Sequence, residues 1–158
     1  MTDLQTLTIL LGQHERQRDA ALGEHLRARA TSEAAVAQAG QLHTYRREYE
    51  QRWSAQFRRE GQMELVHCYQ SFMERLTQAV EQQTRVAEHT AQLLERALAT
   101  LRDTELRCAS VRKLIERRMQ EQRLGAERRD QKQTDEFAAR AAWNHPEAGG
   151  PNGHSRPR

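Results

Sequence analysis

The sequence predicts an all-α protein, a long two-helix antiparallel coiled-coil hairpin with an overhanging C-terminal helix. The first observation is composition: 37% of the 158 residues are hydrophobic and 30% are charged, which is too polar for a large globular core. The second is that strong helix formers dominate and no proline precedes Pro146. The third is a sustained heptad pattern over residues 65–115. Such polarity also suits disordered chains, but the periodicity favours helices.

The first helix is expected at about residues 3–58. Thr2 and Gln5 have the spacing of a capping box, in which each side chain satisfies a terminal backbone N–H of the other residue. Alanines fill much of the middle of its heptad pattern, and Arg18 and His25 stand where apolar residues are preferred. Because alanine buries little area, we expect this middle section to be marginally stable.

A break is expected at about residues 59–63, where Gly61 suits either a left-handed helix end or the cap of the next helix. So short a connection makes the two helices antiparallel neighbours and pairs residues whose numbers sum to about 122. The second helix is expected at about 64–143, where Leu, Val, Ile and Ala recur at spacings of three and four. Beyond about Met119 it has no first-helix partner and forms an overhang.

The predicted domain is the antiparallel coiled coil of residues 1–143. On the overhang, Phe137 and neighbouring alanines form a small apolar strip that the hairpin does not cover. Residues 144–158 are rich in proline and glycine and are expected to form a disordered tail.

A second apolar ladder runs beside the main one on the second helix, and the combined face is wider than a two-stranded seam requires. Either a third helix covers the extra width, or part of it is a docking surface. Residues with matching 4-3-4 spacing on the two helices lie side by side in the hairpin register. We interpret them as an exposed lateral patch; the alternative is that all belong to the seam between the helices. The lateral patch consists of Gln38, Leu42, Tyr45, Tyr49, Phe72, Leu76, Ala79 and Gln83.

Charge patterning argues against a nucleic-acid-binding protein. The 25 basic and 22 acidic residues are mixed along the same helices, which is typical of solvated helix surfaces rather than a basic stripe. No apolar run approaches the ~20 residues of a membrane span, and no signal-peptide pattern is present. We therefore expect a cytosolic, soluble protein.

Cys68 and Cys108 fall in no metal-binding spacing. On one helix they would lie about 60 Å apart, too far for an intrachain disulfide, so both are predicted to be buried structural thiols. The carboxylates of residues 130–136 lie on an exposed helix without a pocket to shift their pKa values. No metal, no cofactor and no enzymatic activity are expected.

Three segments occur in a characteristic order: Leu42-x-x-Tyr45-x-x-Glu48-Tyr49, Tyr69-Gln70-x-Phe72-x-x-x-Leu76-x-x-Ala79-Val80-x-Gln82, and Asp130-Gln131-Lys132-x-x-Asp135-Glu136-Phe137-Ala138-x-Arg140-Ala141. Together they resemble the FliJ family, the small cytoplasmic coiled-coil component of the bacterial flagellar type III export apparatus. The resemblance spans about residues 1–143. It implies a two-helix antiparallel coiled coil similar to the central gamma stalk of rotary ATP synthases. It also implies binding to the hexameric ring of the export ATPase FliI, to the export gate protein FlhA and to export chaperones.

The resemblance also assigns roles to residues. The lateral patch matches the family's gate-binding surface, with Gln83 at a position where the family residue varies. For the overhang the resemblance implies insertion of the tip into the ATPase ring; the alternative for its cations is a solvated charged face. The candidate ATPase contacts are Arg117, Arg118, Arg123, Arg128, Arg129 and Lys132.

The resemblance implies a stalk, adaptor and chaperone-escort protein of flagellar export that couples ATP hydrolysis to protein export. It would be cytoplasmic and peripherally associated with the inner membrane at the flagellar basal body. One alternative is the equivalent stalk of a virulence type III secretion system. A second is a homo-oligomeric structural coiled coil, and a third, least favoured, is a basic coiled coil on nucleic acid.

Overall fold

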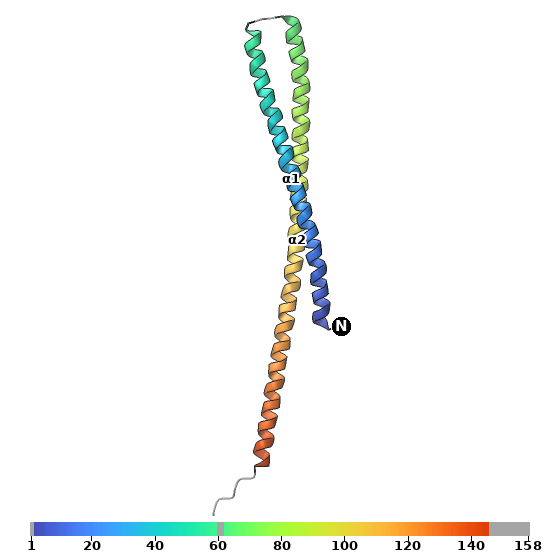
Figure 1. The fold of residues 1–158 in the computed structure, drawn as a ribbon, viewed down its shortest axis with the longest axis vertical. Helices are drawn as coiled ribbons and strands as arrows, with labels where there is room; N and C mark the ends of the chain where they lie inside the picture. The colour runs from blue at the N-terminus through green and yellow to red at the C-terminus, as the bar shows by residue number, and fades with distance from the viewer. Residues whose placement is uncertain (1, 60–61, 146–158) are drawn as a thin grey trace, which may run out of the picture.

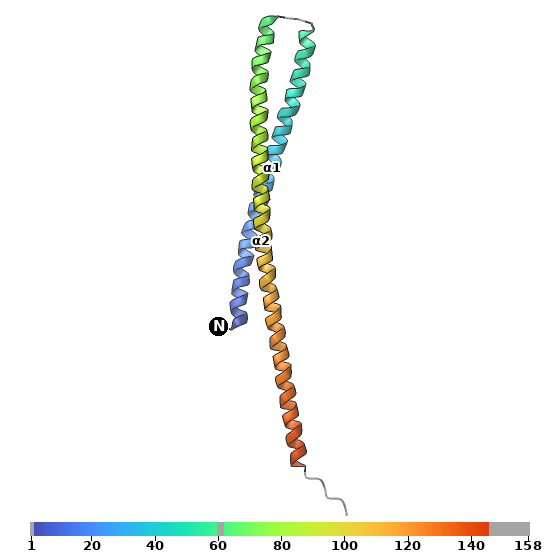
Figure 2. The ribbon, with the colours of Figure 1, turned by 180° about the vertical axis from the view of Figure 1, so that it is seen from behind.

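The computed structural model describes residues 2–59 and 62–145 and contains two helices over this range, α1 (Asp3–Phe57) and α2 (Met63–Asn144). The helices pack against each other as an antiparallel hairpin, and α2 continues far past the start of α1 (Figure 1; seen from behind in Figure 2). The predicted all-α hairpin with an overhanging second helix is confirmed. Neither α1 nor α2 contains a segment long and apolar enough to cross a membrane.

Helix ends agree closely with the local sequence signals. The Thr2 hydroxyl accepts a hydrogen bond from the Gln5 N–H at 3.3 Å, and the Gln5 side-chain oxygen accepts one from the Thr2 N–H at 3.1 Å. This confirms the predicted capping box. At the other end of α1, the Arg59 N–H donates to the Gln56 carbonyl at 3.0 Å. The role predicted for Gly61 falls outside the described residues.

Contacts between α1 and α2 confirm the predicted register. Near the turn, the ring centroids of Tyr49 and Phe72 lie 4.5 Å apart. At the far end of the hairpin, Arg118 forms an ion pair with Asp3 at 3.1 Å. Both pairs of residue numbers sum to within one of the predicted value, so the register holds from the turn to the start of α1.

The core is a single line of side chains between the two helices. Its most buried residue is Cys108, which is 1% exposed. Two seam threonines satisfy their hydroxyls within their own helix: Thr90 donates to the Ala87 carbonyl and Thr104 to the Leu101 carbonyl. The buried residues on α1 are Ala21, Ser32 and Ala35, and those on α2 are Leu76, Val80, Thr90, Leu101, Thr104, Cys108 and Val111.

The middle of α1 brings polar side chains into this line. Arg18 and His25 are half-buried there, as their heptad positions indicate. The Nδ1 atoms of His14 and His25 are buried and have no hydrogen-bond partner among the residues that the structure describes. An unpaired buried polar atom costs free energy, so this section is less stable than an apolar seam of the same length.

The two cysteines differ in their surroundings. Cys108 lies in the core, whereas Cys68 is exposed, and both are free thiols. The prediction that Cys68 is a buried structural thiol is therefore wrong. Cys68 lies four residues after Glu64, and both are on the outer face of α2, turned away from the seam.

Candidate functional site

A cluster of aromatic side chains fills the hairpin near the turn. On α1 the rings follow one another at spacings of four residues, which puts them on one helix face. Neighbouring ring centroids along this face lie 5.3–5.9 Å apart. Rings from α2 meet them across the seam at 4.5–5.5 Å. We call this the aromatic cluster; it consists of Tyr45, Tyr49, Trp53, Phe57, Tyr69 and Phe72.

The lateral patch predicted from the sequence overlaps this cluster, but it is not a uniformly exposed face. Gln38 and Tyr45 are exposed, and Tyr45 retains 46% of its accessible surface. Leu76 is only 7% exposed, so the interpretation of Leu76 as part of an exposed patch is wrong, and this residue belongs to the seam. Leu76 and Val80 are one helical turn apart on the same face of α2, and both are in the core. This face therefore packs against α1. The other patch residues are half-buried; they are Leu42, Tyr49, Phe72, Ala79 and Gln83.

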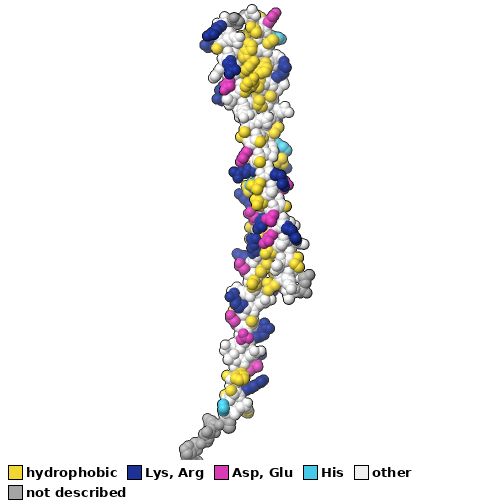
Figure 3. All heavy atoms as spheres, in the orientation of Figure 1, with side chains coloured by type: hydrophobic (Ala, Val, Ile, Leu, Met, Phe, Trp, Pro, Cys, Tyr) yellow, Lys and Arg dark blue, Asp and Glu magenta, His cyan; other side chains and the backbone are white. Residues whose placement is uncertain are grey.

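The patch is therefore the edge of the seam, where partly buried rings remain accessible from one side. Figure 3 shows hydrophobic side chains gathered over this end of the hairpin. Trp53, Phe57 and Tyr69 belong to the same cluster although the predicted patch omits them. The four-residue spacing of the rings on α1 is visible in the sequence and could have added Trp53 and Phe57 to the patch.

Tyr69 is the ionisable member of the cluster whose environment departs most from water. Burial raises the pKa of the Tyr69 hydroxyl, and the nearby negative charge of Glu50 raises it further, against an opposing effect of Arg46. The hydroxyl therefore keeps its proton to higher pH than an ordinary tyrosine, and in this form it can donate a hydrogen bond to a partner.

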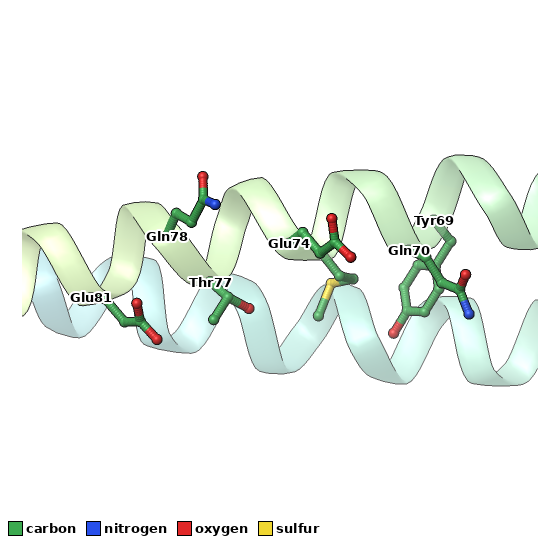
Figure 4. Close-up of a pocket in the computed structure, with 7 residues that line it drawn as sticks. Tyr69, Gln70, Glu74, Thr77, Gln78 and Glu81 are labelled. Atoms are coloured by element: carbon green, nitrogen blue, oxygen red, sulfur yellow. The ribbon is translucent and has the colours of Figure 1, made fainter.

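An open groove runs along α2 beside Tyr69 (Figure 4). Two carboxylates, Glu74 and Glu81, lie two helical turns apart among its lining residues. The lining offers no nucleophile paired with a base, so its chemistry suits binding rather than catalysis. Its full lining is Tyr69, Gln70, Met73, Glu74, Thr77, Gln78 and Glu81.

The overhang carries the second set of candidate contacts. All six predicted ATPase contacts, Arg117, Arg118, Arg123, Arg128, Arg129 and Lys132, are exposed on α2. Arg118 pairs with Asp3 at 3.1 Å and with Glu121 at 3.5 Å. Over residues 2–59 and 62–145, the other five form no ion pair within 4.0 Å. Their charges are thus available to a partner, an arrangement that a solvated charged face would share.

Comparison with known proteins identifies one family. A family model described as Flagellar FliJ protein matches residues 3–147. No curated protein and no solved structure matches the chain. The matched range contains the aromatic cluster and the six cations of the overhang.

Proposed function

Because this chain belongs to the family of flagellar FliJ proteins, coiled-coil adaptors of flagellar export, we propose that it links the export ATPase to the export gate. It acts as a stalk and chaperone escort that couples ATP hydrolysis to the entry of export substrates. The flagellar description of the matching family favours this role over the equivalent stalk of a virulence secretion system.

The observation that carries the proposal is the unequal length of the two helices. α2 ends at Asn144, whereas the start of α1 meets α2 at Arg118. The unpaired end of α2 is therefore about 26 residues, or about 40 Å, long. A single helix of this length is marginal in water, so a surrounding partner would stabilise it. The proposed partner is the ring of the ATPase FliI, which would enclose this tip.

The aromatic edge of the seam supplies the proposed contact with the gate protein FlhA. Partly buried tyrosine and phenylalanine side chains are common anchors of protein interfaces, because a rigid ring buries a large area at low entropic cost. Tyr45 and Gln38 offer the accessible surface, and Tyr49 and Phe72 extend it into the seam. Leu76 supports these rings from the core and is not itself a contact.

The two surfaces lie at opposite ends of the rod, so one molecule can engage both partners at once (Figure 1). In this role the protein works in the cytoplasm and is held at the inner membrane through the export apparatus at the flagellar basal body. Export chaperones are its third class of partner.

The test is a truncation after Glu116, which removes the overhang together with Arg118, the partner of Asp3, and leaves the rest of the hairpin in place. The truncated chain should no longer co-purify with FliI and should bind FlhA as the full chain does. The matched control is a truncation after Asn144, which keeps both helices and should bind both partners. Unchanged FliI binding by the chain that ends at Glu116 would contradict the proposal.

A further inference from the structure

The overhang contains a short internal repeat. Residues 116–122 read Glu-Arg-Arg-Met-Gln-Glu-Gln, and residues 127–133 read Glu-Arg-Arg-Asp-Gln-Lys-Gln, so five of seven positions are identical. We call these the first and second modules. Their offset is eleven residues, which is three helical turns and a rise of about 16.5 Å. Equivalent side chains therefore lie on one line of α2, with a drift of only about 20° between modules.

The first module shows what kind of group this line binds. Its Arg118 forms an ion pair with Asp3 at 3.1 Å. Asp3 is the acidic residue in the first turn of α1, where the helix dipole favours a carboxylate. Arg118 is shared with an acid of its own module, since Glu121 lies 3.5 Å away. The first module thus receives the acidic start of an antiparallel helix.

The second module keeps both arginines and has a cation in place of the acid Glu121, while Asp130 replaces Met119. Arg129 stands at the position of Arg118, and Lys132 replaces Glu121. Arg128, Arg129 and Lys132 are all exposed, and no described residue forms an ion pair with them within 4.0 Å.

Internal hydrogen bonds involve residues in or directly after the second module. Arg129 donates through Nε to the Gly125 carbonyl of its own helix at 3.3 Å. Asp135, the acid that follows the second module, accepts a hydrogen bond from the Gln131 side chain at 3.1 Å. The three cations therefore keep their charge available for an external carboxylate.

We infer that the second module is the docking site for a partner helix whose first turn carries an aspartate or glutamate. This helix lies end to end with α1 along the same face of α2. Its carboxylate forms an ion pair with Arg129 and Lys132, as Asp3 does with Arg118. The inference rests on the proposed function, because the partner that approaches the overhang is the export ATPase.

The experiment rotates the second module about the axis of α2 relative to the first module and leaves the residues of both modules unchanged. We call the protein with this rotation the phase variant. Two alanines inserted between Gly125 and Ala126 rotate the second module by about 200° and shift it by only about 3 Å. In the full chain, this variant should lose at least tenfold in affinity for FliI. The matched control carries the same two alanines between Ala141 and Ala142, beyond both modules, and should bind within threefold of the unmodified chain.

Circular dichroism of both variants should show unchanged helix content, since alanine is the best helix former. Charge reversal provides a second readout: R129E with K132E should weaken FliI binding at least tenfold, whereas R102E with K113E, at exposed positions of α2 alongside α1, should change it less than threefold. Equal binding by the phase variant and its control overturns the docking site, as does equal binding by the two charge-reversal variants.

The outcomes separate this inference from the proposed function. If the unmodified chain does not bind FliI, both are overturned. If the unmodified chain binds and the phase variant binds equally well, the proposed function stands and only the role of the second module is overturned.

Discussion

The turn end and the middle of the hairpin are built from very different side chains. Near the turn, six aromatic rings fill the space between α1 and α2. In the middle, the buried residues of α1 are only Ala21, Ser32 and Ala35. A buried aromatic side chain removes about 150–250 Å² from water, several times the area of an alanine. Because these rings are half-buried, or exposed in the case of Tyr45, the difference at about 25 cal/mol per Å² amounts to about 1–2 kcal/mol for each half-buried ring.

The middle is weakened further by its polar groups. His14 and His25 each bury an Nδ1 atom that has no hydrogen-bond partner within residues 2–59 and 62–145. α1 is nevertheless helical without interruption from Asp3 to Phe57. An unbroken helix therefore does not imply strong packing against its partner helix. We expect the two helices to separate first in the middle and last at the aromatic cluster.

The largest expected effect is at the aromatic cluster. Tyr49→Ala removes the ring that contacts Tyr45, Trp53 and Phe72. It should lower the free energy of unfolding by about 2–3 kcal/mol, measured by urea denaturation followed by circular dichroism. A loss below about 0.5 kcal/mol would show that the cluster is not the stable end of the hairpin.

Tyr45 separates binding from stability within the same cluster. Because its ring is 46% exposed, Tyr45→Ala should lower the free energy of unfolding by less than about 0.5 kcal/mol. The affinity of the Tyr45→Ala variant for FlhA should be about tenfold lower than that of the unmodified chain, equivalent to about 1.4 kcal/mol. Calorimetric titration with FlhA measures the affinity, and Val36→Ala, another exposed position on α1, serves as the control.

Filling the weak middle should strengthen it. His25→Leu removes an unpaired buried Nδ1 atom and adds apolar surface to the seam. The free energy of unfolding should rise by about 1 kcal/mol. His43→Leu, at an exposed position of α1, is the matched control. It should change the free energy of unfolding by no more than about 0.3 kcal/mol. Destabilisation by His25→Leu would mean that the histidine has a compensating contact in the folded protein.

The smallest effect is at alkaline pH. Because the pKa of Tyr69 is raised in the folded protein, the hydroxyl deprotonates more readily in the unfolded chain. Its contribution to stability is therefore fully present below the ordinary pKa of 10.0 and is lost as pH rises through the folded value. Above pH 10.0, the free energy of unfolding should fall less steeply with pH for Tyr69→Phe than for the unmodified chain. Urea denaturation of both proteins at a series of pH values measures this difference. Identical pH profiles would show that Tyr69 is not responsible.

The candidate site was predictable from the sequence only in part. The four-residue spacing of Tyr45, Tyr49 and Trp53 places their rings on one face, and the hairpin register brings Phe72 to them. Which members of the predicted patch are accessible was not predictable, and Leu76 proved to be in the core. Two apolar stripes lie side by side on α2, and heptad spacing does not tell which stripe faces the partner helix.

The sequence by itself determined the two helices, their break, the capping box at Thr2 and the exposed overhang. These features depend on local propensity, capping and periodicity, and on a connection too short for any arrangement except antiparallel neighbours. Only the tertiary structure decided the rotation of each helix about its own axis. That rotation buries Leu76, leaves Cys68 exposed and joins Arg118 to Asp3. The physical reason is that the rotation is set by the packing of side chains across the whole seam, which depends on residues far apart in the sequence.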